Sequence, residues 1–200
     1  MPGKRAETLY IMMLLAQEYT LERAFDGLSD QEMHWEPHQG AWGVRRRSEC
    51  STPTPLGARK SEWVADFDKK LAAAADKGRA VEPMTTISWL LSHIASAPGG
   101  AAAFDVVGGP VASETRGAYS KLWSYRIFPT ADEAVAEFRA GWSALTRGLR
   151  DTTDEMLEKQ YAIGGSVITG TQFVANVVNE VNHHATQVCT LRDLYRQRPP

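Results

Sequence analysis

The stretch that most constrains the fold is residues 171–196, in which apolar side chains recur every three or four positions. The row consists of Phe173, Val177, Val181, His184, Val188, Leu191 and Tyr195. Residues at this spacing lie on one face of an α-helix. The stretch therefore predicts one long amphipathic helix, and the rest of the chain must supply elements that cover its apolar face.

Three further segments show the same spacing and predict the other principal helices: residues 4–25, 85–94 and 130–149. Threonine precedes the second and third of these, as is typical of a helix start. No segment alternates convincingly as a strand, although residues 161–169 could form a short extended piece. The sequence therefore predicts an all-α fold, a bundle of four principal helices with long connections.

The first connection contains the turn residues of a loop. Ser29 followed by Glu32 predicts a capping box and a helix that must end before Pro37. Glycines and prolines then interrupt any periodicity over residues 36–60, for which we expect a long loop. Loops of this length inside a domain are usually functional or mobile.

The middle of the chain is less regular. Trp63, Phe67 and Leu71 are spaced four apart and predict a helix over residues 61–80. Pro98-Gly99-Gly100 is expected to kink the second principal helix, with residues 101–107 continuing it and residues 108–129 forming another loop. We expect a single domain over residues 1–200.

Charge and composition exclude several classes of protein. The 200 residues carry a formal net charge of -2, which argues against a nucleic-acid-binding domain. No stretch approaches the ~20 apolar residues of a membrane span, and the apolar run near the N-terminus is too short for a signal peptide. Two cysteines exclude a disulfide scaffold. We therefore expect a cytoplasmic protein that binds neither nucleic acid nor membrane.

Three residues form a candidate metal-binding set. Glu180 precedes His184 by one helical turn, so both side chains can reach a common point. His93 lies near the apolar face of the second principal helix and would complete a set of two histidines and one carboxylate. Such a set suits a divalent transition metal with open coordination positions. The alternatives are a carboxylate–imidazole hydrogen bond for Glu180 and His184, and a core hydrogen bond to a backbone carbonyl for His93.

The remaining histidines are weaker candidates. His183 points about 100° away from His184 around the helix, which favours a surface or supporting position. His34 and His38 belong to the predicted loop region, where they would at most line the mouth of a site. Neither Cys50 nor Cys189 lies in a sequence context typical of a catalytic thiol.

The chain resembles the DinB-like (YfiT-like) superfamily of helical bundles. This superfamily includes transferases that use bacillithiol or mycothiol and the mycothiol-dependent maleylpyruvate isomerases. Four stretches carry the likeness in the family's order: residues 28–37, 40–45, 85–95 and 180–195. They span most of the chain, and residues 100–130 match poorly.

The resemblance implies a metal site with one histidine from the second helix and two, four residues apart, from the last. These positions fall on His93, Glu180 and His184, so glutamate stands where histidine is usual. The implied cofactor is a divalent transition metal, zinc or nickel first, with manganese and iron as alternatives. The resemblance also allows a homodimer.

The implied function is a metal-dependent transferase that uses a low-molecular-weight thiol on a small electrophilic substrate. The substrate-binding candidates are Trp35, Trp42, Arg45 and Asn176. The tryptophans and the arginine have a plainer interpretation, since tryptophans also anchor cores and a run of arginines is often only solvated. Two other functions stay open at this point: a metal-dependent hydrolase, and a non-catalytic small-molecule-binding or stress-associated bundle that is metal-free.

Overall fold

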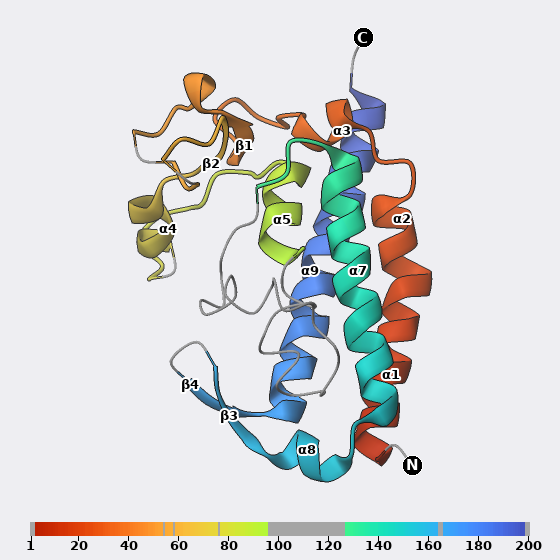
Figure 1. The fold of residues 1–200 in the computed structure, drawn as a ribbon. Coiled ribbons are helices and arrows are strands. Elements are labelled where there is room, and N and C mark those ends of the chain that lie inside the picture. The colour runs from red at the N-terminus through yellow and green to blue at the C-terminus, as the bar shows by residue number, and fades with distance from the viewer. Residues whose placement is uncertain are drawn as a thin grey trace.

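The bundle predicted from the periodicity is present in the computed structural model, which describes residues 3–53, 55–57, 59–75, 77–95, 127–163 and 166–198. Three long helical columns and one shorter helix lie along one another (Figure 1). In chain order they are α1 (Lys4–Ala16) with its continuation, α5 (Ile87–Ile94), α7 (Ala131–Asp151) and α9 (Gly170–Gln197). Of the predictions above, the kink at residues 98–100, the helix over 101–107 and the loop over 108–126 lie outside the described residues.

The first helix contains one irregular turn. After α1 the backbone makes a π-helical turn over Gln17–Leu21 and then continues as α2 (Glu22–Phe25). A π turn holds one more residue than an α turn, so it changes which side chains face the core. Leu21, the last residue of the turn, is buried, as are Ala24 and Phe25 after it and Ala6, Leu9 and Met13 before it.

Threonine caps place the starts of the other principal helices. Thr86 accepts a hydrogen bond from the backbone N–H of Trp89, and Thr130 accepts one from Glu133. Thr169 forms a complete capping box with Gln172. These bonds satisfy backbone donors that the first helical turn leaves unpaired. The predicted starts of the last three helices are thereby confirmed to within a residue or two.

Two two-stranded sheets flank the bundle. β1 (Gly43–Arg46) pairs antiparallel with β2 (Trp63–Asp66), so that Gly43 faces Asp66. β3 (Gln160–Ile163) pairs with β4 (Ser166–Thr169), which confirms the extended piece predicted at residues 161–169. The shorter helices among the described residues are α3 (Asp30–His34), α4 (Lys69–Ala75) and α8 (Asp154–Glu158), and Arg47–Glu49 form a 3-10 turn.

The first sheet corrects two predictions. Residues 36–60 are not all loop, because β1 lies within them, and residues 61–80 are not one helix, because β2 occupies their start. The three residues spaced four apart do not share one helix. Trp63 lies in β2, Phe67 belongs to an aromatic cluster, and Leu71 lies in α4. Both strands are four residues long, and buried residues are adjacent in them rather than alternating. A strand of that kind leaves no period-2 pattern in the sequence.

A buried ion pair joins the last helix, α9, to α3 near the start of the chain. The guanidinium of Arg192, on α9, donates from Nε to Oε1 of Glu32 at 2.9 Å, and both side chains are buried. Its Nη1 donates to the carbonyls that end the first helix, those of Arg23, Ala24 and Asp26. The predicted capping box is consequently only half formed. Ser29 accepts from the Glu32 N–H, but the Glu32 carboxylate turns to Arg192.

No helix among the described residues is long and apolar enough to cross a membrane.

Candidate metal centre

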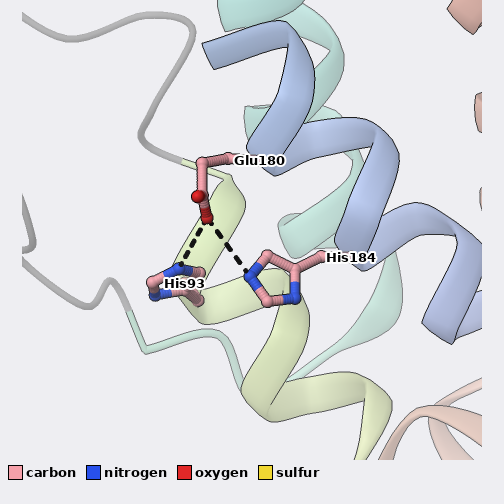
Figure 2. A group of neighbouring side chains, drawn as sticks. All are labelled: His93, Glu180 and His184. Atoms are coloured by element: carbon pink, nitrogen blue, oxygen red, sulfur yellow. Dashed lines mark ion pairs between the residues drawn. The ribbon is translucent and has the colours of Figure 1, made fainter. Parts of the chain in front are cut away.

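His93, Glu180 and His184 converge on one point between two helices, as Figure 2 shows. Oε2 of Glu180 lies 3.7 Å from Nε2 of His93 and 3.5 Å from Nε2 of His184. One potential ligand atom from each residue lies within 4.8 Å of the other two. Atoms bound about 2.1 Å from one ion lie roughly 3–4 Å apart, so the three need only small adjustments to share a metal.

Helix packing produces this convergence. Helix α5 contacts α9, and His93 stands in the last turn of α5. Glu180 and His184 are one turn apart on α9, and both point toward His93 (Figure 2). Leu90, Leu91 and Ile94 are buried in the main core and hold α5 in place. Donors on packed helices keep a more precise geometry than donors on loops.

Gln187 determines which nitrogen of His184 faces the centre. Its Oε1 lies 2.7 Å from Nδ1 of His184, at a distance where Nδ1–H donates. The proton on Nδ1 leaves the lone pair on Nε2, the atom that faces Glu180. A partner of this kind orients metal-ligating histidines in known centres. Gln187 was not predicted, although its position three residues after His184 places it on the same face.

Both imidazoles are held in the neutral form that a metal requires. Burial and then the neighbouring His184 lower the pKa of His93 to about 4. Burial also lowers the pKa of His184, against the opposing effect of its hydrogen bond to Gln187. The Glu180 side chain is 38 % exposed, compared with 16 % for His93. Solvent therefore reaches the centre from the carboxylate side.

The lowered pKa of His93 predicts a dependence of stability on pH. Unfolded histidine takes up a proton near pH 6.5, whereas folded His93 does so near pH 4. Between these values the unfolded state binds more protons, so stability falls as the pH falls. The pKa difference corresponds to about 3 kcal/mol, lost from about pH 6.5 down to about pH 4.

Urea unfolding of metal-free wild-type protein and of His93→Gln, across this pH range, measures the effect. The variant is expected to lose this share of the pH dependence, while the share due to carboxylates stays in both proteins. Equal pH slopes for the two proteins would contradict the prediction.

Two of the predicted substrate-binding residues lie near the centre or are linked to it. Asn176 is exposed, one turn before Glu180 on α9. Trp42 packs against Trp89, whose ring meets the His93 ring edge-on with centroids 5.5 Å apart. Trp89 is thus, among the described residues, an aromatic side chain that contacts the centre, and it was not predicted. Its position four residues before His93 is the signal that indicates it.

The structure does not bring the other two to the centre. Trp35 packs edge-on against Tyr195, which is about 16 Å beyond His184 along α9. Arg45 forms ion pairs with Glu36 and with the buried Asp66. Their substrate-binding role stays a prediction.

The other histidines are placed as follows. His183 is exposed, in agreement with its predicted direction, and its ring touches that of His184. His34 is not in a loop, because it ends α3. Its two ring nitrogens lie 3.0 and 2.9 Å from the carbonyl oxygens of Val44 and Pro129. It therefore joins α3 to β1 and to the start of α7, while His38 is exposed beside the carbonyl of Gln39.

The donor set fits a divalent transition ion. Two neutral imidazole nitrogens and one carboxylate are ligands that zinc, iron and related ions accept. The carboxylate offsets one unit of the ion's charge, and its exposed side leaves room for further ligands.

Comparison with known families agrees with this architecture. The family model of the DinB superfamily matches residues 13–188, a span that includes all three residues of the centre. No curated protein and no solved structure matches the chain. Because the family match covers most of its length, the chain belongs to the DinB superfamily.

Proposed function

We propose that the protein is a metal-dependent transferase that joins a low-molecular-weight thiol, of the mycothiol or bacillithiol type, to a small electrophile. The observation that carries the proposal is the convergence of His93, Glu180 and His184. Membership of the DinB superfamily supports the same chemistry. A divalent transition metal in this set would lower the pKa of a coordinated thiol and so supply a thiolate at neutral pH.

The residues around the centre would each have a separate role in this reaction. His93 and His184, being neutral, would bind the ion without first losing a proton. Glu180 faces solvent and would mark the side on which the thiol enters. Trp89, backed by Trp42, offers an aromatic wall for the electrophile. In the reaction the sulfur–carbon bond forms, the leaving group departs with its electron pair, and the thiol proton passes to solvent.

A conjugation assay tests the proposal. Untagged protein is first analysed for bound metal, and we expect a transition metal well above background. Metal-loaded protein should then consume mycothiol or bacillithiol in the presence of an electrophilic aromatic halide. Chelator-treated protein should not, and adding the metal back should restore the rate.

The outcomes separate the competing functions. Turnover of an ester or amide substrate that needs the metal but no thiol would replace the transferase by a hydrolase. Absence of metal from the purified protein, together with failure to bind added zinc or nickel, would contradict both enzymes and favour a non-catalytic bundle.

A further inference from the structure

A groove of about 480 Å³ runs along the bundle between α1 with its continuation and α7, which lie side by side in Figure 1. At one end the Tyr10 hydroxyl accepts a hydrogen bond from Arg150, and at the other Asp26 forms an ion pair with Arg139. These two contacts lie roughly 20 Å apart along the first helix. The groove is therefore long and narrow, and its volume is within the range of small-molecule sites.

The floor of the groove is apolar. The ring of Phe138 lies between those of Phe25 and Trp142, with centroids 4.8 Å from the first and 5.9 Å from the second. All three residues are buried and belong to the main core, so the floor is fixed in place. Leu14 lines the groove from α1 and is 41 % exposed. An unbranched hydrocarbon chain matches this shape better than a compact ring system does.

The two ends of the groove differ in charge. Arg139 is compensated by Asp26, and Glu22 adds a second carboxylate at the same end. At the other end, Arg147 and Arg150 stand three residues apart on α7, and neither pairs with a carboxylate among the described residues. Their side-chain hydrogen bonds go to hydroxyl groups, which carry no charge. Because like charges at this spacing repel each other, an anion bound between the two guanidinium groups would be stabilised.

We propose that this groove binds the free anion of a medium-chain fatty acid. The carboxylate would lie against Arg147 and Arg150, whose guanidinium groups carry N–H donors in the planar arrangement that a carboxylate accepts. The chain would run over Leu14 and Trp142 and end before the ion pair of Arg139. The metal centre lies between α5 and α9, so the inference depends neither on the metal nor on the proposed transferase.

Isothermal titration calorimetry with decanoate tests the site. Wild-type protein is expected to bind one equivalent, and to bind the neutral analogue decanol more weakly. From hexanoate to decanoate, each added pair of methylenes should tighten binding about fourfold if half of their surface is buried. Chelator-treated protein should bind decanoate equally well. Absence of saturable binding, including the case in which a second copy of the chain fills the groove, would overturn the proposal, as would binding that is lost with the metal.

Three variants locate the ligand in the groove. Arg147→Met should weaken decanoate about tenfold, as loss of an exposed charge-assisted hydrogen bond does, and should leave decanol unchanged. Arg196→Met removes an exposed arginine from α9 and is the matched control, which should bind both ligands like wild type. Ser143→Phe places a ring in the groove and should weaken both ligands.

The three substituted residues are exposed, so each variant should keep the circular dichroism spectrum of the wild type. If Arg147→Met and Arg196→Met bind decanoate equally, or if Ser143→Phe binds it like wild type, the anion is bound elsewhere and the site assigned to this groove is wrong.

Discussion

His184→Ala is expected to weaken binding of a divalent transition ion by about 100-fold or more. Loss of a residue that merely supports a ligand costs 10–100-fold in known centres, so loss of a direct ligand should reach at least the upper end of that range. The remaining pair, His93 and Glu180, would hold the ion through two donors only. Competition against a chromogenic chelator, with zinc and nickel in turn, measures the change without relying on activity.

The chain provides a matched control for this experiment. His183 is the adjacent residue, is exposed and is not one of the three converging donors, so His183→Ala should bind metal like wild type. Glu180→His gives three imidazoles, the set that the resemblance implies, and should also retain the metal. If His183→Ala and His184→Ala weaken binding equally, the ion is bound elsewhere and the centre assigned here is wrong.

Arg192→Met is expected to lower the free energy of unfolding by about 3–5 kcal/mol. The substitution keeps the length of the side chain but leaves the Glu32 carboxylate, which is 5 % exposed, without its cation. It also removes the donor to the three carbonyls at the end of the first helix. Urea unfolding measures the loss.

Two further variants identify its cause. Glu32→Gln combined with Arg192→Met removes both charges and should recover much of the stability, because an uncompensated buried charge is the main penalty. Arg23→Met breaks the exposed pair with Asp193 and should change stability by about 1 kcal/mol or less. A loss for Arg192→Met no larger than that for Arg23→Met would show that the buried pair contributes little.

The helices could be predicted from the sequence because a helix cap and an apolar row are both local patterns. The threonines at positions 86 and 130 precede the helices they cap, and the apolar row of α9 follows its buried face. Strand β1 left no such mark, since four residues are too few to show a period. Nor did the role of Glu32 show, because its partner Arg192 lies far along the chain and only the tertiary fold brings them together.

The candidate centre needed a different kind of information. Periodicity placed His93 and His184 near apolar faces but did not show that those faces meet. The family resemblance supplied that step, and the packing of α5 on α9 confirms it. Gln187 and Trp89 were missed because their contacts with the two histidines depend on side-chain directions rather than on residue type.

The π-helical turn at Gln17–Leu21 amounts to a one-residue insertion in the first helix. Converting this turn into regular α-helix without removing a residue would rotate the two halves by about 100° relative to each other. Leu21 and Phe25 would then leave the core if Leu9 and Met13 kept their places in it. The π turn therefore absorbs the extra residue and keeps the apolar side chains of both halves in one core.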